Sequence, residues 1–178
     1  MRYLIYLILS FIMQIVAWLV TPVLPLFAVR REGWSDNKND WRVEPRLPLW
    51  LTWFDTPDNS LYGDKKFLSL NNPSYLSEVK WLYRNSIYGF KWSVLAADCS
   101  EYKYTVPKPQ PNYKGPVFGS FYLKAGKYWQ YKLCKKLTSN YCLLLNLGWL
   151  LDDVENNKKC LFMFSPRIKQ IQVKKDTT

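Results

Sequence analysis

The feature that most constrains this chain is an uninterrupted apolar segment near its start. Residues 3–29 (YLIYLILSFIMQIVAWLVTPVLPLFAV) contain no charged side chain, and their polar interruptions are Ser10, Gln14 and Thr21. About 20 apolar residues are enough for a helix to cross the hydrocarbon core of a bilayer. The segment therefore predicts a membrane anchor.

Two prolines limit the helical part of this anchor. Pro22 and Pro25 lack a backbone N–H and restrict the residue before each. We therefore expect a helix over residues 2–20, about 28 Å long at 1.5 Å per residue, and an apolar exit that completes an anchor over residues 1–29. A cleaved signal peptide is one alternative, but its apolar run spans about 7–15 residues after a basic start. Here the run is longer and only Arg2 precedes it. An interfacial hairpin is the other alternative.

The chain is strongly basic. Lys and Arg number 25 against 14 Asp and Glu, a formal net charge of +11. Such a balance favours polyanionic partners, and beside an apolar anchor we expect these to be anionic lipid headgroups. Nucleic acid is the lesser alternative; it rests on lysines among aromatic residues over residues 122–136, a composition that suits single strands.

The lack of histidine limits the available chemistry. The chain contains none, which excludes Ser-His-Asp and Cys-His catalysis and histidine-ligated zinc. No other pattern selects a catalytic residue or a cofactor site. We therefore expect a non-enzymatic protein with no cofactor.

Basic residues flank the anchor unequally. Arg2 precedes it, whereas Arg30, Arg31, Lys38, Arg42 and Arg46 follow it. The positive-inside rule then places the rest of the chain in the cytoplasm. We expect a single-pass protein whose domain lies on the cytoplasmic side.

Cysteine usage agrees with that orientation. The four cysteines are Cys99, Cys134, Cys142 and Cys160, and no two form a CxxC pair. Cysteines among apolar residues pack as small buried hydrophobes. We expect four buried thiols in a reducing compartment, with two disulfides as the alternative.

Composition divides the rest of the chain into three parts. Residues 30–46 are polar and indicate a juxtamembrane linker, residues 47–166 one globular domain, and residues 167–178 a basic tail that frays.

Within the domain, periodicity predicts a helix and several strands. The helix covers residues 73–88, with Pro73 at its first position and Gly89 as its stop. The expected strands are residues 90–97, 117–124, 128–137, 141–151 and 159–164. The expected fold class is α+β: an N-terminal transmembrane helix, then a small domain with one or two helices and an antiparallel β-meander.

Five tryptophans mark the expected contacts with the membrane interface. They are Trp18, Trp34, Trp41, Trp50 and Trp53. Trp suits a site where one end of the ring is dry and the other is wet. The apolar cluster at residues 49–54 either packs in the core or lies on the bilayer.

One acidic loop is a candidate metal site. Asp55, Asp58, Asn59 and Asp64 offer oxygen ligands of the kind that calcium and magnesium prefer. Their spacing is not that of an EF-hand, and the same residue types build ordinary tight turns. A structural turn is therefore the favoured interpretation, and a metal-dependent hydrolase the alternative.

Several motifs resemble a known group of proteins. TPVLPLF, LPLWLTWFDTPDNSLYGD, VKWLYRNSIYGF and CLFMFSPR are similar to those of an uncharacterised family of small membrane-anchored proteins of tailed bacteriophages. The match rests on the four loop residues above and on Trp81, Arg84, Asn85, Tyr88 and Gly89. The resemblance implies a phage origin and the inner membrane of the bacterial host, but no activity.

The motif residues suggest a structural role. Arg84 ends the predicted helix, and its planar guanidinium suits a carboxylate. Our hypothesis is that Arg84 reaches Asp55, Asp58 or Asp64 and locks the loop to the helix. We read the whole chain as a non-enzymatic interaction module with an unknown protein partner; a virion-associated or injected component is the second hypothesis.

Overall fold

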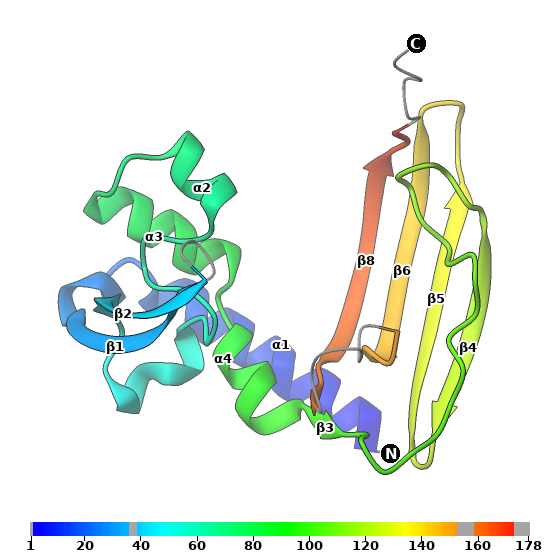
Figure 1. Cartoon of the computed structure of the whole chain (residues 1–178), viewed down its shortest axis with the longest axis horizontal. Coiled ribbons are helices and arrows are strands. Elements are labelled where there is room, and N and C mark those ends of the chain that lie inside the picture. Colours follow the sequence, from blue (N-terminus) through cyan, green and yellow to red (C-terminus); the bar gives the residue numbers. More distant parts are fainter. Residues whose placement is uncertain (1, 36–38, 153–158, 173–178) are drawn as a thin grey trace. The chain divides into compact units, whose positions relative to one another are not determined.

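The computed structural model describes residues 2–35, 39–152 and 159–172. The chain forms two compact units, Met1–Leu95 and Ala96–Thr178 (Figure 1). The single domain expected over residues 47–166 is therefore wrong. Residues 47–95 pack with the N-terminal segments, whereas the later strands form a sheet with its own core.

The α+β fold class is confirmed, with an N-terminal apolar helix, several short helices and antiparallel sheets. Unit Met1–Leu95 contains α1 (Arg2–Val20), η1 (Leu24–Phe27), β1 (Val29–Ser35), β2 (Asp40–Arg46), η2 (Leu49–Phe54), α2 (Lys65–Leu70), α3 (Tyr75–Arg84), α4 (Tyr88–Phe90) and η3 (Lys91–Leu95). Helix α1 has the bounds expected from the sequence.

The segment expected as a linker is a β-hairpin. β1 pairs antiparallel with β2, from Val29 opposite Arg46 to Ser35 opposite Asp40. Trp34 and Trp41 face each other across the two strands, with ring centroids 6.4 Å apart. Cross-strand aromatic pairs stabilise a hairpin even where other residues are charged, so the polar composition concealed the strands.

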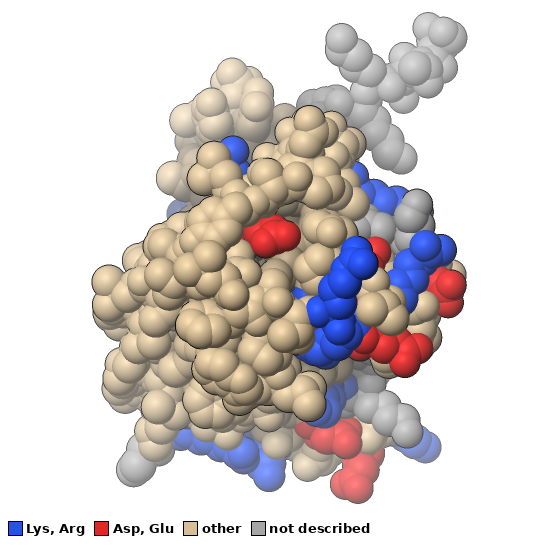
Figure 2. Space-filling model, turned by 90° about the vertical axis from the view of Figure 1, so that its left-hand side faces the viewer, with Lys and Arg blue, Asp and Glu red and all other residues tan. Residues whose placement is uncertain are grey.

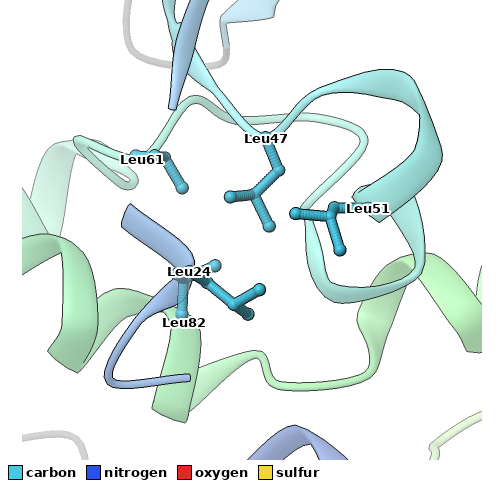
Figure 3. Packing of buried hydrophobic residues seen from close by; sticks show 5 residues of the cluster. All are labelled: Leu24, Leu47, Leu51, Leu61 and Leu82. Carbon is cyan, nitrogen blue, oxygen red and sulfur yellow. The ribbon is translucent and has the colours of Figure 1, made fainter. Parts of the chain in front are cut away.

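Leucines from five segments form the core of this unit. Leu24, Leu47, Leu51, Leu61 and Leu82 pack together and are at most 9% exposed (Figure 3). Burying one leucine side chain contributes roughly 1.5–3 kcal/mol. This cluster joins η1 to η2 and α3.

Helix α3 is shorter than expected. Ser74 is its N-cap and forms a reciprocal capping box with Ser77, so Pro73 lies before the helix rather than at its first position. The helix ends at Arg84, and Asn85 is the C-cap. The predicted helix over residues 73–88 is therefore wrong at both ends.

The strand expected over residues 90–97 is mostly helical. α4 and the π-helical turn η3 occupy residues 88–95, and only Ala97–Asp98 (β3) is extended. Gly89 does not stop a helix: its N–H donates to the Asp55 carbonyl at 3.0 Å. This long-range contact overrides the β-propensity of Trp92 and Val94.

The second unit is the expected antiparallel meander. It contains β3 (Ala97–Asp98), β4 (Gly119–Ala125), β5 (Tyr128–Lys136), β6 (Tyr141–Trp149), β7 (Lys159–Cys160) and β8 (Phe162–Gln170), and β4-β5-β6-β8 form one sheet. The strand expected over residues 159–164 is instead divided between β7 and β8. Because β8 continues to Gln170, the basic tail does not begin at residue 167. Pro166 and the charges of β8 are tolerated there because the strand lies at the sheet edge.

All four cysteines are buried free thiols, as expected from the sequence. Burial raises the pKa of Cys134 to about 11 and also raises the pKa values of Cys99 and Cys160. These thiols therefore stay protonated near neutral pH and are poorly reactive.

Candidate membrane-contact surface

Helix α1 exposes a broad apolar surface. Among the described residues it is the one helix long and apolar enough to cross a membrane, a property that signal sequences and core helices share. A core helix would be mostly buried, but in α1 only Ser10 and Ala17 are. Ten large apolar side chains are exposed: Leu4, Ile5, Ile8, Leu9, Phe11, Ile12, Ile15, Val16, Trp18 and Leu19.

The exit segment and η2 extend this apolar surface. Leu26 is 70% exposed, Leu49 76% and Trp50 71%. Phe27 and Trp50 meet edge to face at 5.8 Å, so the exit and η2 are in direct contact. Seen from the side of the hairpin, the molecule presents a broad area without charged side chains, with Lys, Arg, Asp and Glu at its border (Figure 2).

The predicted interface tryptophans differ in their surroundings. Trp18, Trp41, Trp50 and Trp53 are exposed, whereas Trp34 is only half-exposed and packs against Trp41. Trp53 also contacts the buried Phe90 ring at 5.4 Å. Four of the five therefore present surface to the surroundings.

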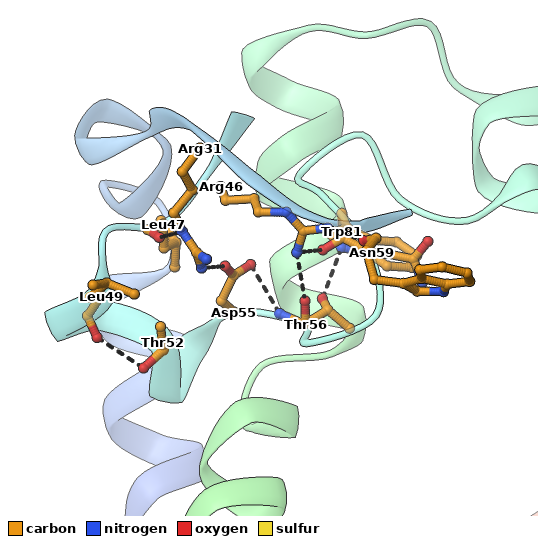
Figure 4. A network of polar contacts seen from close by, with 10 residues as sticks. Arg31, Arg46, Leu47, Leu49, Thr52, Asp55, Thr56, Asn59 and Trp81 are labelled. Atoms are coloured by element: carbon orange, nitrogen blue, oxygen red, sulfur yellow. Dashed lines mark hydrogen bonds and ion pairs between the residues drawn. The ribbon is translucent and has the colours of Figure 1, made fainter. Parts of the chain in front are cut away.

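Beneath the hairpin lies a buried network of charges (Figure 4). Arg31 Nη2 lies 3.0 Å from Asp55 Oδ2, and Arg31 Nε donates to the Leu47 carbonyl at 2.9 Å. Arg46 is 2% exposed; it donates to the Asn59 carbonyl at 2.9 Å and to the Trp34 carbonyl. The two arginines thus tie both strands to residues 55–59.

Burial governs the protonation of this network. Desolvation raises the pKa of Asp55 to about 6, against the Thr56 N–H and the two arginines, which favour the carboxylate. Desolvation likewise lowers the pKa of Arg46. Burial thus outweighs the contacts that favour the Asp55 carboxylate.

The candidate metal ligands take part in structural contacts. Asp55 accepts from Arg31 and from the Thr56 N–H at 2.9 Å, and the Asp58 carboxylate acts electrostatically on Arg46. Asp64 caps α2 through the Phe67 N–H at 2.7 Å. In the described parts of the chain, no three His, Cys, Asp or Glu side chains gather where they could hold a metal ion. The geometry fits a structural loop.

The Arg84 hypothesis is confirmed for one carboxylate. Arg84 Nη2 lies 2.8 Å from Asp64 Oδ2, and its guanidinium lies over the Trp81 ring at 5.1 Å. Asn85 Nδ2 donates to the Trp81 carbonyl at 3.3 Å. A Cβ on Gly89 would overlap the Thr52 carbonyl oxygen. These motif residues hold α3, α4 and the loop together.

Sequence reasoning missed the central residues of this network. In the sequence, Arg31 and Arg46 indicate only charges that flank the apolar segment, and Trp81 is only part of a motif. In the structure, Trp81 Nε1 donates to Thr56 Oγ1 at 3.0 Å. The signal that could have found them is the Trp34–Trp41 pair. Placed opposite each other, these rings set the hairpin register.

A family model described as a family of unknown function (DUF7338) matches residues 1–175. No curated protein matches the chain, and no solved structure does.

Proposed function

The chain belongs to this family of unknown function, and we propose that it is a non-enzymatic interaction protein held on a membrane by α1. The observation that carries the proposal is the exposed half of α1. Ten large apolar side chains on one helix are far more than a soluble monomer leaves in contact with water. Acyl chains are the environment that such a surface fits.

The flanking charges support a cytoplasmic leaflet. Arg30 and Arg42 are exposed on the hairpin that follows the anchor. Each Lys or Arg near an anionic surface contributes about 1 kcal/mol to binding. The resemblance to tailed-phage proteins adds the inner membrane of a bacterial host as the proposed location.

The open face of the β4-β5-β6-β8 sheet supports a protein partner. The register brings Tyr122, Tyr131, Leu147 and Phe164 into one row across the four strands. Further along the same face, Ile168 is 68% exposed. Apolar rows of this kind suit a protein interface, where aromatic residues are enriched.

Flotation with vesicles tests the membrane attachment. The wild-type chain should float with vesicles of phosphatidylglycerol and phosphatidylethanolamine. Ile8→Glu with Ile15→Glu, both on the exposed half of α1, should lower the bound fraction at least tenfold. The control Leu49→Glu, on η2, should lower it only a few-fold. Equal binding by the α1 variant would contradict the proposal.

Crosslinking in cells that express the chain tests the partner surface. Ile168→Asp on the open face should abolish a crosslinked adduct that the wild type gives. Lys136→Asp, whose strand partner Cys142 lies on the opposite face, is the matched control and should keep the adduct. Loss with both variants, or with neither, would contradict a role for this face.

A further inference from the structure

Helix α1 is divided lengthwise into two different faces. Every exposed residue after Arg2 is large and apolar. The opposite face carries Ser10, Gln14, Ala17 and, just past the helix, Thr21, at spacings of three and four that stack residues on one side of a helix. Ser10, Ala17 and Thr21 are buried. The polar side of α1 is therefore turned away from the surroundings over most of its length.

Helix α3 and the residues just after it cover the C-terminal half of that polar side. Gln14 Nε2 donates to Ser86 Oγ at 2.8 Å. Tyr83 Oη donates to the Trp18 carbonyl at 3.1 Å, and Tyr75 Oη donates to the Pro22 carbonyl. The residue number rises along α1 as it falls along α3, so the two run antiparallel.

These contacts supply hydrogen-bond partners that α1 cannot provide within its own backbone. The Trp18 carbonyl would normally accept a hydrogen bond from the N–H of the residue four places later, but that residue is Pro22. The Tyr83 hydroxyl supplies the missing donor. Without α3, the Trp18 carbonyl and the Gln14 amide would lie unpaired in hydrocarbon. The free-energy cost would be several kcal/mol for each group.

A crossing helix conflicts with this packing. Gln14 lies six residues before the end of α1, or about 9 Å along its axis. If α1 stood upright in a core of about 30 Å, Ser86 would lie about 9 Å deep. Arg84, two residues earlier and paired with Asp64, would be drawn in with it, and ionised side chains in hydrocarbon are costly.

We infer that α1 lies along one leaflet of the membrane instead of crossing it. Its apolar half enters the acyl chains, and α3 covers part of its polar half where water would otherwise be. An interfacial helix needs one apolar and one polar face, and here the protein itself supplies partners for the polar face. The inference rests on the proposed membrane attachment and replaces the single-pass topology expected from the sequence.

Sided labelling of full-length protein in bacterial inner-membrane vesicles tests the topology. Arg2→Cys at the start of α1 and Lys66→Cys on α2 are both exposed sites. A membrane-impermeant maleimide should label both sites in one kind of vesicle, right-side-out or inverted, and neither site in the other kind. The wild type is the control, and its four cysteines, at most 1% exposed, should stay unlabelled. Labelling of the two sites from opposite sides would overturn the inference.

A paired-cysteine variant tests whether α1 stays on α3 in the membrane. In Gln14→Cys with Ser86→Cys, two copper(II)-phenanthroline ions should each accept one electron from the thiols. The two protons should pass to the buffer, and the two sulfur atoms should join as a disulfide. Phe11→Cys with Ser86→Cys, whose first site is 66% exposed, should give none. An absent disulfide in the first pair would overturn the inference. Wild-type protein that leaves the vesicles in flotation would instead overturn the membrane attachment itself.

Discussion

The two units arrange their buried polar contacts differently. In Met1–Leu95, the half-buried Arg31 and the buried Arg46 and Asp55 join segments distant in the sequence. In Ala96–Thr178, the neutral Gln130 and Asn146 lie on neighbouring strands, and Gln130 Nε2 donates to Asn146 Oδ1 at 3.0 Å. One ion pair, between Lys132 Nζ and Asp152 Oδ2 at 2.6 Å, lies beside them. The first unit depends on charged contacts between distant segments, whereas the second places its amides and this ion pair on a regular ladder.

This difference predicts where single substitutions are most damaging. Removing one member of a buried charge network leaves the others unpaired and lowers the free energy of unfolding by about 3–5 kcal/mol. Removing a neutral group leaves donors or acceptors unpaired and lowers it by about 1–3 kcal/mol. The four cysteines all lie in the second unit, so thiol labelling reports on that unit separately.

The largest effect is expected for Arg46→Met. The substitution keeps most of the side-chain volume but leaves the Thr56, Asn59 and Trp34 carbonyls without their donor. The free energy of unfolding in detergent micelles should fall by about 3–5 kcal/mol, measured by tryptophan fluorescence in urea.

The matched control is Arg42→Met, an exposed arginine on the same strand, which should change stability by less than about 0.5 kcal/mol. In Arg46→Met, the urea dependence of thiol labelling should stay that of the wild type if the two units unfold separately. A parallel shift in labelling would show that they unfold together.

The second unit could be predicted largely from its sequence because its strands depend on local signals. Alternation over Tyr128–Lys136 and turn residues on both sides place β5 within one residue of the expected range. Neighbouring strands follow each other directly, so each turn also fixes the next pairing. The long β8 was missed because Pro166 and its basic residues resemble a tail.

The first unit resisted prediction because its segments are fixed by distant partners. The hairpin needs the buried Arg46, and α4 needs the close approach of Gly89 to the Thr52 carbonyl. Neither contact leaves a periodic pattern. Helix α1 was the exception, since nineteen residues with one charge and a following proline determine both its type and its end.

The next effect concerns the pH dependence of the first unit. Because the pKa of Asp55 is raised from 3.8 to about 6 in the folded protein, the folded state binds this proton more tightly than the unfolded chain does. Its contribution to stability is therefore greatest below pH 4 and is lost as pH rises through 6. The loss is on the order of 2–3 kcal/mol.

Comparison with Asp55→Asn isolates this contribution from other carboxylates. The free energy of unfolding of the wild type, minus that of the variant, should decrease between pH 4 and pH 7. A difference that increases with pH would mean that Arg31 and Arg46 outweigh burial. Urea titrations at several pH values measure it.

A smaller effect is expected in the second unit for Gln130→Leu. Gln130 Oε1 accepts from the Leu151 and Asp152 N–H groups at 2.8 and 2.9 Å, and its amide donates to Asp152. Losing these partners should cost about 2 kcal/mol and speed the labelling of Cys160. The exposed Gln170→Leu is the control. Unchanged labelling in Gln130→Leu would show that the sheet and the Lys132–Asp152 ion pair hold residues 150–152 without Gln130.

The smallest effect is expected for Arg84→Ala, although its ion pair was the one foreseen from the sequence. Both partners are open to solvent, with Arg84 48% and Asp64 29% exposed, and such pairs contribute about 0.2–1 kcal/mol. Lost contact with the Trp81 ring adds about 0.5 kcal/mol. The melting temperature should therefore fall by only a few degrees, and Arg84→Lys, which keeps the charge but not the planar fork, should recover part of the loss. A loss as large as that of Arg46→Met would show that the surface pair, rather than the buried network, holds the loop to α3.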